Sequence, residues 1–255
     1  MKSALDNPWL MSFTQVFGMR PSRLKLIAGA VRMAEPSDTH TLLEVGCGNG
    51  VTAVFLSQEY GCNVVGIDSS ERMIALAAKQ AEAKKLAYRV EFLVADAVNL
   101  PFPDSMFDTI ICEAVFSTLV DKERAAKEFS RVLRSGGKLL ILDFVLRREI
   151  AKEFQSQMSF FPCLARTRQL EGYIRLFEQV GFQNPYIEDY PQEVKMIGYW
   201  IAYTSGSWDK PFANPSAQSG CDSKETLDGD SLVKTCQRFS KEAGLGYALI
   251  ALTKP

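Results

Sequence analysis

Long hydrophobic runs are absent from this chain of 255 residues. No stretch approaches the roughly 18 consecutive apolar residues of a membrane-spanning helix, and residues 1–25 lack the pattern of a signal peptide. An excess of one charge is absent as well, because 29 lysines and arginines stand against 30 aspartates and glutamates. A nearly neutral chain has no general attraction to nucleic acids or anionic membranes. We therefore expect a cytoplasmic protein with neither kind of partner.

Cysteine and histidine are too few and too scattered to define a metal or disulfide site. The six cysteines show no C-x-x-C spacing and are not grouped with the single histidine, His40. A disulfide framework and a zinc site are therefore not expected, and no metal is predicted. His40 stands just before the first expected strand, where a structural role is expected. Hydrophobic residues make up 47% of the chain, enough for a sizeable core.

A glycine-rich loop is the most informative stretch that the chain does contain. Residues 42–45 read as a short buried strand, Gly46, Gly48 and Gly50 form the loop, and residues 51–60 can continue as a helix. Glycines adopt backbone angles that other residues avoid, and they let a ligand approach the main chain. The spacing is G-x-G-x-G, whereas a nicotinamide-dependent oxidoreductase would need G-x-G-x-x-G.

An acid two residues before the first glycine completes the pattern. The run from Glu44 to Gly50 resembles motif I of the class I S-adenosylmethionine (SAM) dependent methyltransferases. In that family the loop holds the sulfonium amino acid and its ribose. The resemblance therefore makes Glu44, Gly46, Cys47 and Gly48 candidate cofactor-binding residues. Cys47 is most simply a small residue within the loop.

A second acid follows the next expected strand, Asn63–Asp68. Asp68 lies about 20 residues beyond the loop, the interval at which an acid accepts hydrogen bonds from ribose hydroxyls. Ser69 or Ser70 can cap the following helix. In the family that the loop resembles, residues just after this acid also touch the adenosyl group, which makes Ser69 and Met73 secondary candidates.

A third acid ends the expected strand 90–95. The resemblance implies that the Asp96 carboxylate accepts a hydrogen bond from the adenine amine and that the Ala97 N–H meets a ring nitrogen. Residues 96–108 also resemble the family's run D-x-x-x-L-P-F-x-D-x-x-F-D.

That run leads into a fourth strand, 107–112, which ends at Glu113. Open parallel sheets bind ligands outside the carboxyl ends of their strands. We therefore expect the glycine loop, the two preceding acids and Glu113 to face one crevice. In the family the position of Glu113 varies and often faces the substrate. Asp108, at the start of this strand, is expected at the opposite edge in a structural role.

The rest of the chain continues the alternation of helices and strands. The run R-V-L-R-S-G-G-K-L resembles the family's glycine turn, which is expected at 134–138. Gly181 is expected to end a helix. Further helices are expected at 24–31, 121–133, 170–180, 191–205 and 231–243, strands at 139–144, 184–190 and 247–253, and a long loop at 206–230.

The resemblance, to the methyltransferase type 11 or UbiE-like group, implies an α/β fold of the Rossmann-like kind. We expect a seven-stranded, mostly parallel sheet with an antiparallel last strand, helices on both faces and an N-terminal helical lid. Residues 1–40 are expected to form the N-terminal helical segment and residues 41–144 the SAM-binding core. Residues 145–255 then complete the sheet and cover the substrate side, all within one structural domain.

The function that the resemblance implies is methyl transfer from SAM to a small-molecule acceptor, with S-adenosylhomocysteine (SAH) as the product. An in-line displacement from a sulfonium depends mainly on approach and alignment. No dedicated base is evident, so the catalytic residues stay unassigned. Glu113 and Asp143 are candidates if the acceptor needs one. A homodimer is left open.

Two alternatives stay open at this point. Phe160–Leu164 and the C-terminal cysteine loosely resemble arsenite methyltransferases, which would make the protein an arsenite or thiol methyltransferase that uses Cys163 and Cys236. That family also uses a cysteine near the motif I helix, where this chain has Val51, Thr52 and Ala53. The other alternative is a SAM-binding protein without catalysis.

Overall fold

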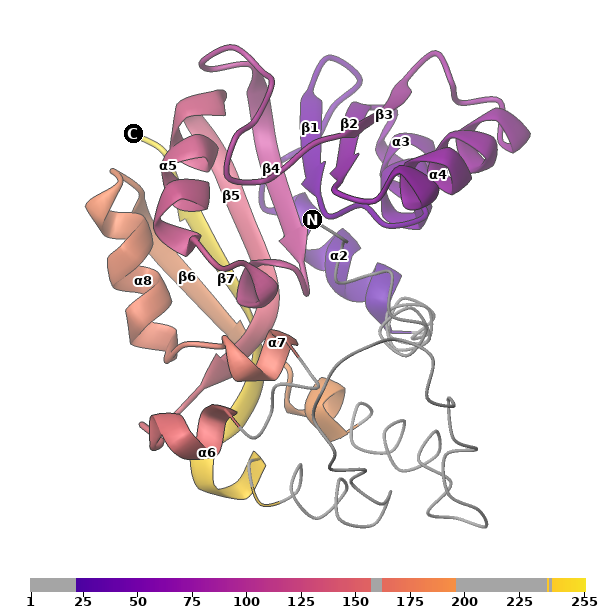
Figure 1. The fold of residues 1–255 in the computed structure, drawn as a ribbon. Helices are drawn as coiled ribbons and strands as arrows, with labels where there is room; N and C mark the ends of the chain where they lie inside the picture. Colours follow the sequence, from indigo (N-terminus) through magenta and orange to yellow (C-terminus); the bar gives the residue numbers. More distant parts are fainter. Residues whose placement is uncertain (1–21, 157–161, 196–237, 239) are drawn as a thin grey trace, which may run out of the picture.

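A seven-stranded sheet, in the order β3-β2-β1-β4-β5-β7-β6, forms the centre of the molecule (Figure 1). The computed structural model describes residues 22–156, 162–195, 238 and 240–255. The strands are β1 (Thr41–Val45), β2 (Asn63–Asp68), β3 (Val90–Val94), β4 (Phe107–Glu113), β5 (Leu133–Leu146), β6 (Gln183–Asp189) and β7 (Leu245–Thr253). β1 to β5 pair in parallel, whereas β7 runs antiparallel to both β5 and β6. The predicted sheet is confirmed.

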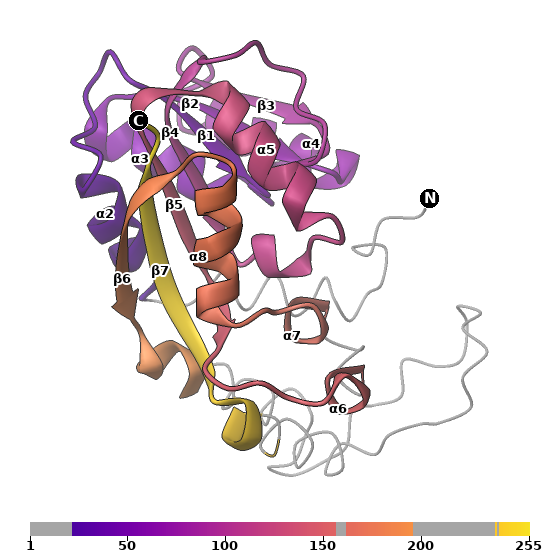
Figure 2. The same ribbon diagram turned by 90° about the vertical axis from the view of Figure 1, so that its left-hand side faces the viewer.

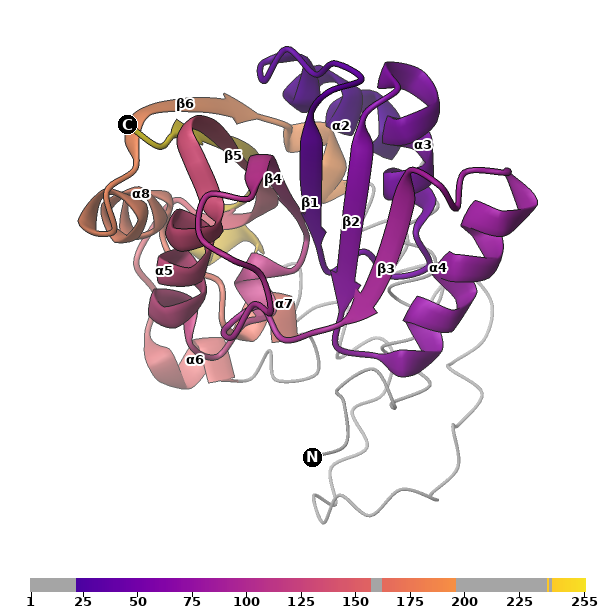
Figure 3. The ribbon, with the colours of Figure 1, turned by 90° about the horizontal axis from the view of Figure 1, so that it is seen from above.

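Helices cover both faces of the sheet, as predicted (Figures 2 and 3). One face carries α2 (Arg23–Arg32), α3 (Val51–Tyr60) and α4 (Glu71–Ala83), and the opposite face carries α5 (Lys122–Val132) and α8 (Leu170–Gln179). Each face has its own cluster of buried hydrophobic side chains. On α5 the buried positions recur at helical spacing, and on the strands the apolar residues alternate between the two clusters.

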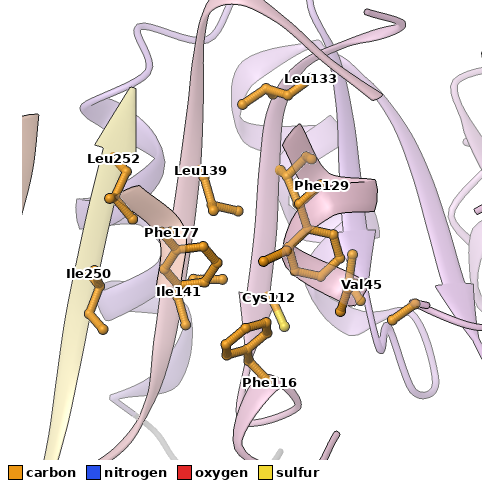
Figure 4. Packing of buried hydrophobic residues seen from close by; sticks show 14 of the residues in the cluster. Val45, Cys112, Phe116, Phe129, Leu133, Leu139, Ile141, Phe177, Ile250 and Leu252 are labelled. Carbon is orange, nitrogen blue, oxygen red and sulfur yellow. The ribbon is translucent and has the colours of Figure 1, made fainter. Parts of the chain in front are cut away.

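The cluster beneath α5 and α8 is rich in aromatic rings (Figure 4). The Phe116 ring lies 4.9 Å from the Phe177 ring and 5.9 Å from the Phe129 ring, measured between centroids. All three side chains are fully buried. Aromatic side chains of this size contribute strongly to core stability. Phe116 belongs to the short 3-10 helix η2 (Phe116–Thr118), so this packing anchors the segment that follows β4.

The prediction that residues 134–138 form a turn between a helix and a strand is wrong. β5 begins at Leu133, pairs there with Phe107, and shifts register before Thr109. The Gly136 N–H donates to the carbonyl of Lys254 at 2.7 Å, and the Lys254 N–H donates to the carbonyl of Gly137 at 3.0 Å. Gly136 has a φ of +77°, so the two glycines form an irregularity inside a paired strand.

Several short elements lie beyond the carboxyl ends of the parallel strands, where the arrowheads of β1 and β4 point (Figure 1). They are α6 (Lys152–Ser156) and α7 (Pro162–Ala165), and a helical turn at 191–195 follows β6. The predictions for residues 1–21, 196–230 and 231–237, which include part of the N-terminal lid, lie outside the described residues. The proposed domain boundaries stay a prediction.

Candidate functional site

The glycine loop that follows β1 is held against the end of β2. The N–H groups of Gly46 and Cys47 both donate to the carbonyl of Ile67, at 2.8 and 2.9 Å. Gly46 has a φ of +73°, and a Cβ on it would lie 2.3 Å from Cγ2 of Val115, so only glycine fits. A Cβ on Gly48 would meet no atom within 4 Å. The backbone at Gly48 is therefore open to a ligand.

Asp68 is fixed to this loop by hydrogen bonds from the backbone. Its Oδ2 accepts from the Gly48 N–H at 3.0 Å, and its Oδ1 accepts from the Ser70 N–H at 2.9 Å. Burial raises the pKa of Asp68, and these backbone donors act against that rise. The structure confirms the prediction that the glycine loop and Asp68 lie side by side. The contact with ribose stays a prediction.

The other adenosyl candidates lie around the same strand ends. Ser70, rather than Ser69, caps α4, since its Oγ accepts from the Met73 N–H at 3.4 Å. Ser69 is exposed and Met73 is buried. Beyond β3, the Ala95 N–H donates to the carbonyl of Asp68 at 3.1 Å, which brings the third strand end beside the second.

Asp96 and Ala97 come shortly after the end of β3. The Asp96 Oδ1 accepts from the Val98 N–H at 3.1 Å, while the residue as a whole is exposed. Ala97 is buried. Both residues follow the end of β3, and their contact with adenine stays a prediction.

An arginine that the sequence reasoning missed enters the site from α2. Arg23 Nε lies 2.5 Å from Oε2 of Glu113, at the end of β4, and the two side chains are only 12% and 6% exposed. Burial works against the guanidinium charge, but the carboxylates of Glu113 and Glu44 outweigh it and raise the pKa of Arg23. The two partners are 90 positions apart in the chain. No local sequence signal could have joined them.

Glu44 completes this charged cluster. The residue is 3% exposed, and its Oε2 has no hydrogen-bond partner among the described residues. The pKa of Glu44 is raised to about 7, mainly by burial and also by the charge of Glu113, while the charge of Arg23 acts against the rise. Two carboxylates therefore face one guanidinium. An oxygen buried without a partner is costly and marks a place where a cationic ligand group would be stabilised.

The raised pKa of Glu44 makes the stability of the ligand-free protein depend on pH. Between the ordinary value of 4.5 and about 7, the folded protein holds a proton that the unfolded chain has released. The contribution of Glu44 to the free energy of unfolding therefore falls as pH rises through this window. We expect the stability of Glu44→Gln relative to wild type to rise by on the order of 2–3 kcal/mol from pH 5 to pH 8 in urea unfolding. The exposed Glu59→Gln should show no such change, and equal slopes for Glu44→Gln and wild type would contradict the assignment.

Each of the two candidate bases, and Asp108, is already engaged by other groups of the protein. Asp143 is 1% exposed and accepts hydrogen bonds from the N–H groups of Ser117 and Phe144, so it is not exposed to an acceptor. Glu113 is ion-paired with Arg23. Asp108 is structural, as predicted, because its Oδ2 accepts from the Thr41 N–H at 2.6 Å.

The last residues that the sequence singles out are a histidine and three cysteines. His40 donates and accepts through its backbone, and its Nδ1 has no partner among the described residues. Cys163 lies in α7, but its side chain is outside the described part of the chain, as are Cys221 and Cys236. Within the described ranges, no group of three or more His, Cys, Asp or Glu could hold a metal ion. None of the helices described is long and apolar enough to cross a membrane.

The glycine loop, the acid beside it and the charged cluster all lie at the carboxyl ends of parallel strands, where open α/β sheets bind their ligands. Residues 43–141 match the family model described as "Methyltransferase domain". The chain therefore carries a class I SAM-dependent methyltransferase domain over these residues, and the predicted family, fold and cofactor are confirmed.

Curated relatives agree with this membership. The chain is 32% identical over 162 residues to methyltransferase GfsG of Streptomyces halstedii, covering 62% of this chain and 58% of that protein. It is 28% identical over 229 residues to 27-O-demethylrifamycin SV methyltransferase of Amycolatopsis mediterranei, covering 84% of this chain and 77% of that protein. It is 40% identical over 116 residues to demethylmenaquinone methyltransferase of Thermus thermophilus, covering 45% and 52%. The chain thus spans little more than half the length of two of these relatives.

Solved structures share the fold at lower identity. A geranyl diphosphate methyltransferase in complex with SAM has a TM-score of 0.68 at 20% identity, covering 89% of this chain and 85% of that one. The [4+2]-cyclase SpnF also has a TM-score of 0.68, at 23% identity, covering 91% and 81%. At these identities the likeness shows the fold alone, and a cyclase among the matches means that the fold does not by itself establish methyl transfer.

Proposed function

We propose that this chain transfers a methyl group from SAM to a small-molecule acceptor by in-line displacement. One observation carries the proposal: the glycine loop with Asp68 and the cluster of Arg23, Glu44 and Glu113 lie side by side at the carboxyl ends of β1, β2 and β4. The two groups suit the two ends of SAM, since one offers carboxylate oxygens for ribose and the other offers charges for an amino-acid zwitterion.

The charges present fit this cofactor. SAM carries a sulfonium, an ammonium and one carboxylate, and the site offers more carboxylates than guanidinium groups. The unpartnered Oε2 of Glu44 would accept from the ammonium, and Arg23 would face the carboxylate. The open backbone at Gly48 would allow the ligand to lie close to the loop. Gly46, Cys47, Ser69, Met73, Asp96 and Ala97 stay candidates for the remaining contacts.

When bound, SAM supplies an activated methyl group, so the protein's own task is to hold two reactants in line and exclude water. Of the two candidate bases, Asp143 is enclosed and Glu113 is paired with Arg23, so neither is directed at an acceptor. Such a site suits an acceptor atom that is nucleophilic without a base. The cytoplasmic location and a homodimer remain predictions.

Arg23→Met tests the assignment of the amino-acid end. Removing the guanidinium should weaken SAH binding about 10-fold to 30-fold, in line with the loss of one charge-assisted hydrogen-bonded pair. Binding of 5′-methylthioadenosine should not weaken, since it carries the adenosine and sulfur but no amino-acid end. Calorimetric titration of both ligands makes the comparison. Arg32→Met, on the exposed end of the same helix, is the control.

Two results would count against this assignment of Arg23. One is equal losses for SAH and 5′-methylthioadenosine. The other is an SAH affinity equal to that of Arg32→Met.

The activity itself is tested with SAM labelled on its methyl group. Purified protein is offered hydroxyl, amine, thiol and carbon acceptors, and arsenite as a separate arm, and labelled product and SAH are measured. We expect label transfer and SAH formation that depend on one acceptor class. Transfer to arsenite alone would favour the arsenite reading. SAH binding without transfer to any acceptor would favour a binding protein without catalysis.

A further inference from the structure

Two buried charges lie outside the cofactor cluster and take no part in the proposed function. Lys122, at the start of α5, is 2% exposed, and Asp143, near the end of β5, is 1% exposed. Both act on residues 114–119, which we call the post-β4 turn. Asp143 Oδ2 accepts from the Ser117 N–H at 2.8 Å, and Lys122 Nζ donates to the carbonyls of Ser117 and Leu119 at 2.9 and 2.6 Å. The backbone of Ser117 is therefore held through both its N–H and its carbonyl.

Keeping these charges buried is unfavourable. Burial lowers the pKa of Lys122 to about 8, and Asp143 partly restores it. Burial likewise raises the pKa of Asp143 to about 6, against the donors from Ser117 and Phe144. Buried ion pairs often add no net stability over hydrophobic residues of similar size. What these two groups do provide is partners for the N–H of Ser117 and for the carbonyls of Ser117 and Leu119, in addition to the turn's own backbone bonds from Thr118 to Val115 and from Leu119 to Phe116.

The post-β4 turn reaches the glycine loop at its other end. Ala114 has a φ of +55°, which is unusual for a residue with a side chain, and its N–H donates to the carbonyl of Leu142 at 2.8 Å. Val115 follows, and its Cγ2 occupies the space beside Gly46 where a Cβ would lie. Glu113, immediately before the turn, holds Arg23. A change in the turn would therefore move both the packing beside the loop and the partner of Arg23.

We propose that Lys122 and Asp143 are positioning residues for the cofactor: together they hold the post-β4 turn so that Val115 and Glu113 stand correctly against the glycine loop. This inference rests on the proposed SAM site. The turn also accepts, through the Thr118 carbonyl, a hydrogen bond from Arg166 Nη1 at 3.0 Å. It thus links the cofactor loop to the segment after α7.

The experiment measures SAH binding by calorimetry, which returns the dissociation constant and the fraction of binding-competent protein separately. Lys122→Met keeps the apolar stem and removes the ammonium, and it should raise the dissociation constant for SAH about 10-fold at unchanged stoichiometry. Lys127→Met, on the exposed face of the same helix, should leave it unchanged. Asp143→Asn, which keeps the shape of the side chain, is the second variant and should weaken binding in the same direction.

A coupling measurement separates positioning from general stability. If both groups hold one turn, Lys122→Met/Asp143→Asn should weaken SAH binding by less than the product of the two single effects. A role in stability alone would lower the competent fraction and leave the dissociation constant unchanged, and that result for either variant that folds overturns the inference. Failure of the wild-type protein to bind SAH would instead overturn the proposed function.

Discussion

Gly46→Val is expected to raise the dissociation constant for SAH at least about 100-fold, equivalent to about 2.7 kcal/mol. Gly46 has a φ of +73°, and the left-handed region costs an L-residue roughly 1–2 kcal/mol, more when it is β-branched. The new Cβ would also lie 2.3 Å from Cγ2 of Val115. Because the N–H of Gly46 donates to Ile67, the loop cannot move away without losing that bond. Calorimetric titration with SAH provides the measurement.

Two further variants separate the causes of that loss. Gly46→Ala/Val115→Ala removes most of the clash and keeps the strained φ, so it should recover part of the affinity that Gly46→Val loses. Gly29→Ala, in the interior of α2 where a Cβ meets nothing within 4 Å, should bind SAH normally and gain up to about 1 kcal/mol of stability. Near-normal SAH binding by folded Gly46→Val would refute the role assigned to the loop.

The fold could be predicted because each signal was local and the rules that join strands are general. The strand that contains Glu44, the glycine spacing and the acid at Asp68 each occupy a few consecutive residues. Because the carboxyl ends of parallel strands meet at one sheet edge, these distant positions could be placed together without knowing which residues contact each other. The bounds of β2 and α3 agree with the expected ranges for the same reason.

The charged clusters could not be predicted, because nothing local encodes which buried charges meet. Arg23 is separated from Glu113 by 90 positions, and it lies just before the helix that the sequence predicts at 24–31. Lys122 stands among several exposed charged residues of α5, yet it is buried at the first turn of that helix, where its side chain bends back to the post-β4 turn. The glycines at 136–137 were misread because a turn and a bulge use the same residue.

The two halves of the site, the loop with Asp68 and the cluster of Arg23, Glu44 and Glu113, differ in which groups hold their side chains in place. Asp68 is oriented by backbone N–H groups, so its geometry is set by the loop and by the first turn of α4. Glu113 is instead held by another side chain, Arg23, which comes from a separate element and whose charge also acts on Glu44. On the proposed assignment, the half of the site for adenosine is therefore preorganised by the glycine loop and α4, whereas the half for the amino-acid end depends on α2 staying in place.

Asp68→Ala is the variant that tests the preorganised half. Removal of the carboxylate deletes the predicted ribose acceptor and leaves the N–H groups of Gly48 and Ser70 without their partner. We expect SAH binding to weaken at least about 100-fold, since a site built around a buried polar group discriminates strongly when that group is lost. Asp68→Asn keeps the shape and one acceptor oxygen, so its loss should be smaller. Asp38→Asn, at an exposed position with the same change in charge, is the control.

Titration with SAH and with 5′-methylthioadenosine should distinguish Asp68→Ala from Arg23→Met. Because 5′-methylthioadenosine retains the ribose, Asp68→Ala should weaken it as strongly as SAH, whereas Arg23→Met should weaken SAH alone. The two variants thus assign each half of the ligand to its own half of the site. Unchanged affinity for both ligands in folded Asp68→Ala would refute the ribose contact. A loss confined to SAH would mean that Asp68 faces the amino-acid end, and that the orientation of the cofactor along the sheet edge is the reverse of the one inferred.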